Sequence, residues 1–262
     1  MGESQRKKLT PRDNHNHIIL SDIDSMVGSA RARAIKEFSI TEHVSQFREP
    51  RSSIDFGSIH DTGRIFESLK EYDLEFSKIK NNEEIKVRRG LEVDYSPRYE
   101  TKVGNYVNQD EFEILLCSVH ELEDGTDVQR PGTMRKDEDP KKLWLEYIEL
   151  QKRALESDFV PFNVLTHPVR MAQGVKKDAC PENIDELLLD LAKTARKRNI
   201  ALELNGSDLN FSELLVRKLA IACSEAGCKV SLGSDAHRPH EVFRNMSKAN
   251  KIVEELGLEV LP

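Results

Sequence analysis

The feature that most constrains this chain is a repeated alternation of short apolar runs with segments of helical periodicity. Residues 159–166 and 200–204 are apolar runs typical of buried strands. Between them, apolar residues recur at helical spacing from Ile184 to Ala195, with Pro181 at a favoured first-turn position. A chain that alternates strands and helices in this way is expected to pair its strands in parallel, with right-handed crossovers.

The same rhythm extends over the whole sequence. It predicts a helix from a cap at Ser212 to a stop at Gly227, and a last helix marked by Val242 to Val253. A first strand just before His15 completes about seven strand–helix units. Further strands are expected at 38–41, 86–93, 113–119 and 229–232, further helices near 24–36, 60–80 and 140–156, and a long loop at 121–139.

The 262 residues are about the size of one barrel of alternating strands and helices. No Gly/Ser or Pro tract resembles a linker, so the sequence predicts a single α/β domain over 1–262, with its core at about 13–256. No apolar run approaches the ~20 residues that span a bilayer, and the polar start lacks a secretory signal. Four irregularly spaced cysteines suit a reduced, cytoplasmic protein. The net charge of −7 argues against a protein that coats nucleic acid.

Almost every predicted strand ends in a histidine or a carboxylate. Six of the eight histidines fall at these ends, whereas His60 and His240 do not and are expected at the surface. Because the carboxyl ends of parallel strands meet on one face of a barrel, these side chains should converge there. The strand ends read HNH at 15–17, TEH at 41–43, GLEVDY at 90–95, SVH at 118–120, THP at 166–168, ELN at 203–205 and GSDAH at 233–237.

Imidazoles and carboxylates gathered in one basin are what divalent metals bind. Each residue alone has a plainer interpretation. His43 or His120 could be a capping or core histidine, and Asp22 could be a helix cap. Glu92 could be a solvated charge, but it follows an apolar Leu in a strand that should be half buried, where a lone carboxylate is costly. Asp235 and His237 lie two apart, so in an extended segment they would face the same way. Taken jointly, the residues predict a metal site.

At this point the chain resembles the polymerase-and-histidinol-phosphatase (PHP) phosphoesterases. The motifs HxH with SD five residues after its second histidine, TEH, GLEVDY, a strand-final His, THP and GSDAH follow in the order of that family, from about Asp13 to His240. The resemblance implies a distorted (β/α)7 TIM-like barrel. It also implies two or three divalent metal ions, commonly zinc, manganese or iron.

Carried over by motif, the resemblance implies three linked metal positions. Glu42 stands where many family members have Asp, and it is expected to orient His43. The polar residues before His15 are expected to loosen the first strand. The implied ligands are His15, His17, Glu92 and Asp235 for the first ion, Glu92, His120 and His167 for the second, and Asp22, His43 and His237 for the third.

The expected reaction is in-line hydrolysis of a phosphate monoester by a metal-bound hydroxide, held through Asp235, His237 and Glu92. No nucleophilic serine or cysteine is needed. Arg170 and Arg238 begin at the predicted mouth and could bind the phosphate, or could be solvated surface charges. The loops at 45–60 and 121–139 are expected to shape substrate choice.

A small-molecule phosphatase of the histidinol-phosphatase type is the leading prediction, with a phosphorylated metabolite as its partner. One alternative is a nucleotide or oligonucleotide phosphoesterase. Another is a non-catalytic PHP module, which the filled motif positions disfavour. The sequence leaves the substrate, the metal and the oligomeric state open, because loops carry specificity and His/Asp/Glu sets accept several metals.

Overall fold

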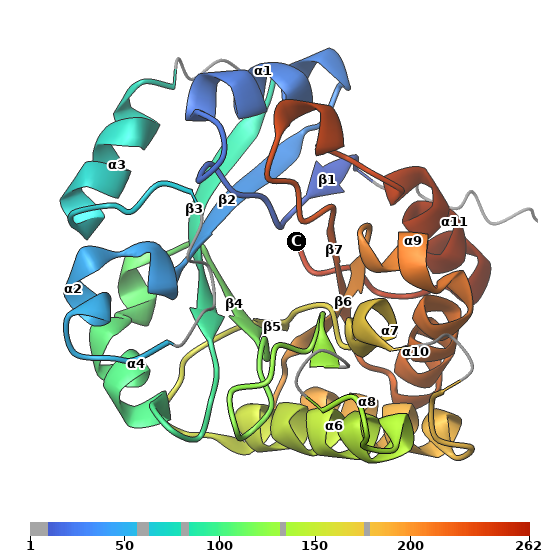
Figure 1. The fold of residues 1–262 in the computed structure, drawn as a ribbon. Coiled ribbons are helices and arrows are strands. Elements are labelled where there is room, and N and C mark those ends of the chain that lie inside the picture. Colours follow the sequence, from blue (N-terminus) through green and yellow to red (C-terminus); the bar gives the residue numbers. More distant parts are fainter. Residues whose placement is uncertain (1–9, 57–62, 80–83, 132–134, 176–178) are drawn as a thin grey trace, which may run out of the picture.

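Seven parallel strands in sequential order form the centre of the molecule (Figure 1). The structure, a computed structural model, describes residues 10–262 except 57–62, 80–83, 132–134 and 176–178. His60 therefore lies outside the described residues. The strands are β1 (Arg12–Asp13), β2 (Glu37–His43), β3 (Lys86–Asp94), β4 (Ile114–Ser118), β5 (Val164–Leu165), β6 (Ala201–Asn205) and β7 (Val230–Gly233).

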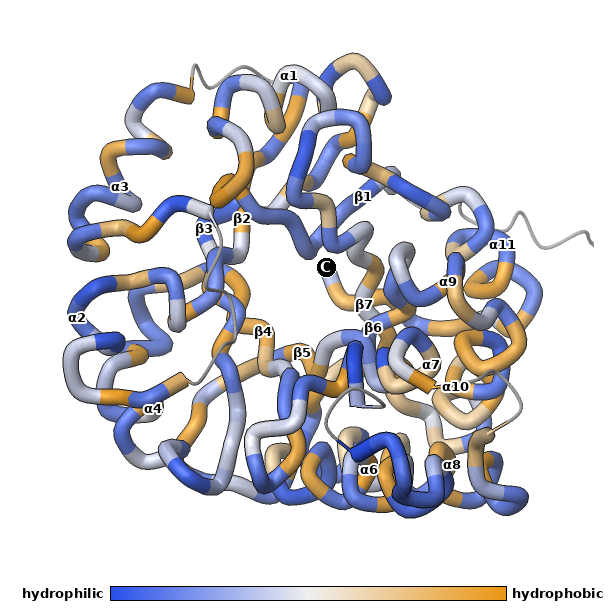
Figure 2. The backbone as a smooth tube through the Cα atoms, viewed as in Figure 1, coloured by the Kyte–Doolittle hydropathy of each residue, from blue (hydrophilic) through white to orange (hydrophobic). Residues whose placement is uncertain are grey.

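Helices surround this sheet on the outside, so the predicted barrel is confirmed (Figure 1). Apolar side chains of strands and helices form a buried core cluster. Along the helices, hydrophobic residues alternate with hydrophilic ones (Figure 2). The helices are α1 (Ile23–Ala32), α2 (Arg48–Arg51), α3 (Leu69–Ser77), α4 (Glu100–Tyr106), α6 (Pro140–Glu156), α7 (Met171–Gly174), α8 (Ile184–Lys197), α9 (Asp208–Phe211), α10 (Glu213–Ala226) and α11 (Met246–Leu256), with 3-10 turns η1 (Val44–Gln46), η2 (Gln109–Glu111) and η3 (Pro239–Glu241).

The ends of several elements differ from the expected ones for local reasons. Strand β5 has only two residues of the predicted eight, since Pro161 lacks the N–H that a central strand must donate. Helix α11 begins at Met246 and not near Val242, because Phe243 and Asn245 have left-handed backbone, with φ of 66° and 58°. The predicted cap of α10 is confirmed: Ser212 accepts from the backbone N–H of Leu215, and Gly227 ends the helix with φ 63°.

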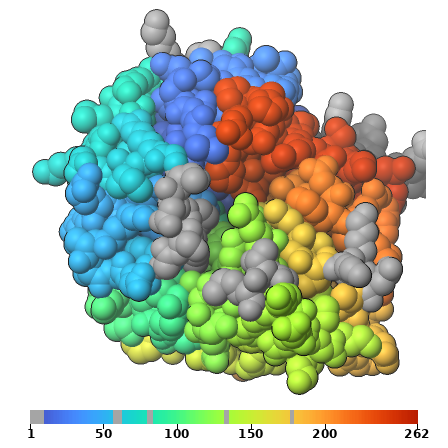
Figure 3. Space-filling model, in the orientation of Figure 1, coloured from blue at the N-terminus to red at the C-terminus, as the bar shows by residue number. Residues whose placement is uncertain are grey.

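The barrel closes between its first and last strands, beyond the short β1. The backbone N–H of Asn14 donates to Leu232 at 2.8 Å, that of Asp235 to His15 at 2.9 Å, and that of His17 to Ala236 at 2.8 Å. In the space-filling view the N-terminal (blue) and C-terminal (red) parts of the chain lie side by side (Figure 3). This closure seam, residues 14–17 against 232–236, brings two motif segments together.

The chain's last residues cover the opposite end of the barrel. Leu261 donates its N–H to the carbonyl of Val230 at 2.8 Å, and Arg88 donates to the carbonyl of Pro262 at 2.8 Å. The Leu261 side chain packs against a small apolar cluster of Ile114, Leu116, Val164 and Ala201 at the starts of β4–β6. No helix among the described residues has both the length and the apolar composition that a membrane crossing needs.

Candidate metal centre

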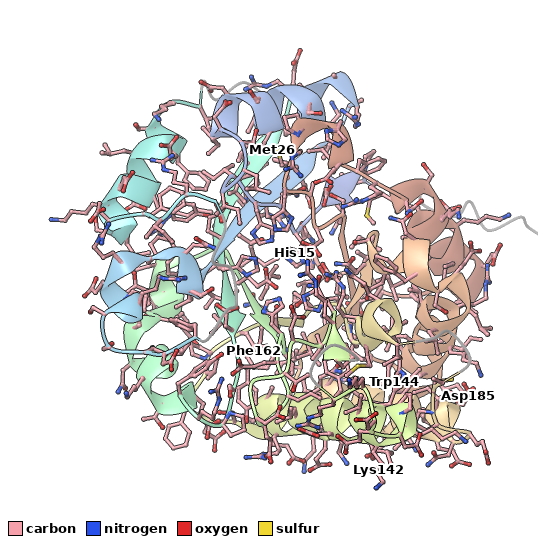
Figure 4. The ribbon with its side chains drawn as sticks, in the orientation of Figure 1. His15, Met26, Lys142, Trp144, Phe162 and Asp185 are labelled. Atoms are coloured by element: carbon pink, nitrogen blue, oxygen red, sulfur yellow. The ribbon has the colours of Figure 1, made fainter. Side chains whose placement is uncertain are left out.

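The carboxyl ends of the strands place most of the predicted ligands in one buried cluster. Glu92 lies near the end of β3, His43 ends β2, and the other residues follow their strands within a few positions. Figure 4 shows His15 pointing into the middle of the barrel. Of the cluster, only His237 is half-buried. The buried members are His15, His17, His43, Glu92, His120, His167 and Asp235.

Glu92 occupies the centre of this cluster and is fully buried. Its two carboxylate oxygens face different sets of histidines, and Ser118 also donates to Oε1. From Oε2, the distances are 2.9 Å to His15 Nε2, 3.2 Å to His17 Nε2 and 3.1 Å to His43 Nδ1. From Oε1, they are 3.3 Å to His167 Nε2 and 3.4 Å to His120 Nε2. This is the arrangement expected of a carboxylate that bridges two ions.

The electrostatics of the cluster favour ionised carboxylates. Burial by itself would raise the pKa of Glu92, but the imidazoles of His43 and His15 outweigh it and hold that pKa well below its ordinary value. Burial, with Arg170 as a second cause, lowers the pKa of His167 to about 4. Burial likewise lowers the pKa of His237 to about 3, so both rings are neutral near pH 7, as ligation requires.

The donor set fits divalent metal ions. The described residues contain four groups of potential ligands. Within each group, the ligand atoms lie within 4.8 Å of one another. Imidazoles combined with carboxylates suit zinc and similar divalent ions. The groups are His15–His17–Glu92, Glu92–His120–His167, His17–His43–His237 and His43–Asp94–His120.

The backbone is strained at two of the predicted ligands. His167 and Asp235 both have positive φ, 33° and 55°, which non-glycine residues seldom adopt. The expectation that residues 235–237 form an extended segment is therefore wrong. Asp235 Oδ1 nevertheless lies 3.5 Å from His17 Nε2 and 3.6 Å from His237 Nδ1, because the left-handed turn aims it into the cluster.

Asp22, predicted as a ligand of a third ion, lies outside the cluster and belongs to none of the four ligand groups found among the described residues. Its exposed carboxylate caps α1, accepting from the backbone N–H of Ser25 at 2.8 Å and from the Ser25 hydroxyl at 2.7 Å. These bonds, before any other contribution, lower the pKa of Asp22. The acids that lie near His43 are instead Glu92 and Asp94, the latter at 3.8 Å.

Glu42 lies against His17 and not against His43, so its expected role as orienter of His43 is also corrected. Its Oε2 is 3.7 Å from His17 Nδ1, and its Oε1 accepts from the backbone N–H of Ile18. Neighbouring residues of a strand point to opposite faces, which keeps Glu42 away from the ring of His43.

The two predicted phosphate-binding arginines have different surroundings. Arg170 is buried, with its Nε 2.5 Å from Asp208 and an Nη2 2.6 Å from Asp235, so the alternative of a solvated surface charge is wrong for it. Arg238 is exposed, as is His240. Both arginines line a cavity of about 340 Å³ that also touches His43, His120, Asp235 and His237.

Two buried carboxylates that sequence reasoning left without a role hold the histidines in place. Glu203 on β6 accepts from His15 Nδ1 and from the backbone N–H of His167, both at 2.9 Å. Asp94 lies 2.9 Å from His120 Nδ1. A histidine whose Nδ1 is bonded in this way presents Nε2 to a metal. The signal was present in the strand ends ELN and GLEVDY, but nothing there separates an orienting acid from a ligand.

Gly233 makes room for the Glu203–His15 pair. A Cβ at this position would lie 2.3 Å from Glu203 Oε1 and 2.4 Å from His15 Cβ, closer than real Cβ atoms approach. The glycine of the GSDAH motif is therefore needed for close packing, since its own φ is not in the left-handed region.

We expect Glu203→Gln to lower metal affinity by about 10–100-fold while the fold persists. One carboxamide can accept only through its oxygen, so its NH2 must face either the N–H of His15 or that of His167. Competition with a chelator measures the affinity. Glu213→Gln, which alters only an exposed pair with Lys248, is the matched control. Equal affinity for the two variants would remove Glu203 from the metal site.

Comparison with known proteins agrees with these observations. A family model described as "PHP domain" matches residues 13–207. A histidinol-phosphatase of Lactococcus lactis subsp. lactis (strain IL1403) is 23% identical over 243 residues, covering 90% of this chain and 85% of the relative. A probable histidinol-phosphatase of Thermotoga maritima is 24% identical over 263 residues, covering 95% and 94%.

Solved structures show the same fold. The histidinol phosphate phosphatase of Lactococcus lactis, solved with zinc, L-histidinol and phosphate, has a TM-score of 0.79 at 20% identity, with 96% of this chain and 95% of that chain covered. A putative histidinol phosphatase of Listeria monocytogenes has a TM-score of 0.72 at 21% identity, with 90% and 99% covered.

Proposed function

Because the chain belongs to the PHP domain family, whose model spans residues 13–207, we propose that it is a metal-dependent phosphoesterase acting on a small phosphate monoester. The observation that carries this proposal is the buried Glu92 carboxylate. Each of five histidines has a ring nitrogen within 3.4 Å of one of its oxygens. The histidinol-phosphatase relatives support a small phosphorylated metabolite as substrate.

We assign the ions to the groups that the geometry allows. Glu92 would bridge one ion held by His15, His17 and Asp235 and another held by His120 and His167. His43 and His237 would hold a third, without Asp22. Divalent ions in such a site activate water near neutral pH and neutralise phosphoryl oxygens. Zinc, manganese and iron all suit these ligands.

The chain's own residues would prepare this chemistry. Glu203 and Asp94 fix the rings of His15 and His120, and the Glu92 carboxylate stays ionised among its imidazoles. The hydroxyl of Ser118 is committed to Glu92, so it is not a free nucleophile. Arg238, which lines the cavity together with His237, would bind a phosphoryl oxygen.

The test is metal analysis of protein purified without a histidine tag, paired with hydrolysis of p-nitrophenyl phosphate and histidinol phosphate. We expect at least two divalent ions per chain and hydrolysis that a chelator abolishes and added metal restores. Fewer than one ion per chain after metal repletion would end the proposal. Ions without hydrolysis of any phosphate ester would favour the non-catalytic module.

The two arginines predicted to bind phosphate should behave differently when each is replaced by Ala. Arg238→Ala should raise KM several-fold with metal content and melting temperature unchanged, since the side chain is exposed. Arg170→Ala leaves Asp208 and Asp235 buried without their cation, which costs about 3–5 kcal/mol of stability. Thermal melts and steady-state kinetics separate the effects. Unchanged kinetics for Arg238→Ala would return that residue to a surface role.

The alternative of a nucleotide phosphoesterase is compatible with the proposed substrate class, since a mononucleotide is also a small phosphate ester. A cytoplasmic location and a single-domain chain over 1–262 stay predictions from the sequence. Adding a nucleoside bisphosphate and a short oligonucleotide to the assay distinguishes the substrate classes.

A further inference from the structure

The cavity beside the candidate metal centre is lined by several charged side chains. Its volume is about 340 Å³. Among the described lining residues, three are arginines and two are acids: Arg170, Arg238, Arg244, Asp235 and Glu241. Which of these charges are already neutralised decides what kind of leaving group the cavity can take.

Both acids are committed to the protein. Asp235 accepts from Arg170 at 2.6 Å and faces the histidine cluster. Glu241 accepts through Oε2 from the backbone N–H groups of His237 and Arg238, at 2.9 and 3.1 Å. Glu241 Oε1 is the remaining carboxylate oxygen of this pair of acids, and it faces Arg244 Nη1 at 3.6 Å.

Arg244 is different, because its hydrogen-bonding capacity is largely unused. Its Nη2 lies 3.4 Å from the backbone carbonyl of Asp235, and its Nη1 lies 3.6 Å from Glu241 Oε1. Its Nε is buried and has no hydrogen-bond partner in the described part of the chain. The side chain is 29% exposed, so part of it faces the cavity.

The backbone fixes the position of Arg244. The side-chain amide of Asn245 donates to the carbonyl of Gly206 at 2.8 Å. A Cβ at Gly206 would lie 2.1 Å from the Arg244 carbonyl oxygen, so the two segments touch directly. The backbone that bears the Arg244 guanidinium is thus restrained by its contacts with Gly206. Two neutral lining residues, Gln173 and Gln129, are hydrogen-bonded to each other at 3.1 Å.

We propose that Arg244 binds a second anionic group of the substrate, so that the preferred substrate is a small phosphate monoester whose leaving group carries a carboxylate or a further phosphate. This rests on the proposed function, in which the metal centre and Arg238 take the phosphoryl group to be removed. A guanidinium with spare donors in a partly buried site pairs well with such an anion, and the same charge disfavours a cationic leaving group.

Three esters of similar size test this proposal, since they differ mainly in charge: 3-phosphoglycerate, glycerol 3-phosphate and phosphoethanolamine. We expect kcat/KM to fall in that order, with about tenfold or more between the first and the last. In Arg244→Gln the advantage of 3-phosphoglycerate over glycerol 3-phosphate should disappear, while the rate with glycerol 3-phosphate stays within about twofold. Arg217→Gln, which alters only a surface pair with Glu255, is the control.

A binding measurement keeps the proposal separate from catalysis. Calorimetry on the metal-loaded protein should show 3-phosphonopropionate binding about tenfold more tightly than propylphosphonate, and Arg244→Gln should erase that difference without changing metal content. If no ester is hydrolysed, the proposed function fails and this comparison alone decides the anion site. The inference would be overturned if Arg244→Gln lowered kcat/KM equally for all three esters, or if the parent protein bound the two phosphonates equally. Faster hydrolysis of histidinol phosphate than of glycerol 3-phosphate by the parent protein would also overturn it.

Discussion

Replacing Glu92 with Gln should lower hydrolysis by about a thousandfold and leave less than half of the parent metal content. The carboxylate faces five imidazoles through two oxygens, so losing its charge weakens two ion positions at once. A thousandfold loss corresponds to the several kcal/mol that metal ions contribute to transition-state stabilisation. Elemental analysis and steady-state kinetics on metal-repleted protein measure both effects.

His43→Ala is the comparison variant for this prediction. Its ring lies near only one oxygen of Glu92, with Nδ1 at 3.1 Å from Oε2, so its loss should reduce metal content less. Circular dichroism establishes that each variant is folded. If Glu92→Gln keeps full metal content and the parent rate, Glu92 does not bridge ions.

Asp235→Asn should lower hydrolysis by about a hundredfold or more, with the fold retained. Asparagine tolerates the left-handed φ of 55° at this position better than most residues, and it keeps the shape of the side chain. The charge that attracts an ion is lost, and Arg170 keeps Asp208 as its partner. The melting temperature of the metal-free protein should therefore fall less than that of Arg170→Ala.

A matched replacement on the surface calibrates this result. Asp185→Asn removes a carboxylate whose partner is Lys218 on the outer helices, so the rate should stay within about twofold. An Asp235→Asn protein that is folded, holds full metal and works at the parent rate would contradict the assignment.

The sequence predicted which strand ends converge, because parallel strands leave little choice of where their carboxyl ends lie. It did not separate ligands from residues that resemble them. Asp22 has the spacing of a family ligand, yet it also satisfies the capping preference of α1, and the backbone donors at that helix start hold it there. Only the position of α1 in space decides between the two.

The positioning acids could not be predicted for a related reason. Glu203 and Asp94 act through contacts with residues of other strands, and such distances are not encoded in local spacing. The burial of Arg170 likewise depends on Asp208 and Asp235, which are 38 and 65 residues away in the chain. Long-range pairing is what sequence periodicity leaves undetermined.

The closure seam between residues 14–17 and 232–236 imposes an order on biosynthesis. Asp13 and Ser234, hydrogen-bonded across this seam, are 221 residues apart in the chain. Joining such distant segments carries the loop-closure cost of nearly the whole polypeptide, so this contact forms late. During translation, His15 and His17 are synthesised first. The proposed ligand set is incomplete until Asp235 and His237 have also been synthesised. The proposed ions would therefore find their full ligand set only in the finished barrel, and once bound they would stabilise the protein against opening at its seam.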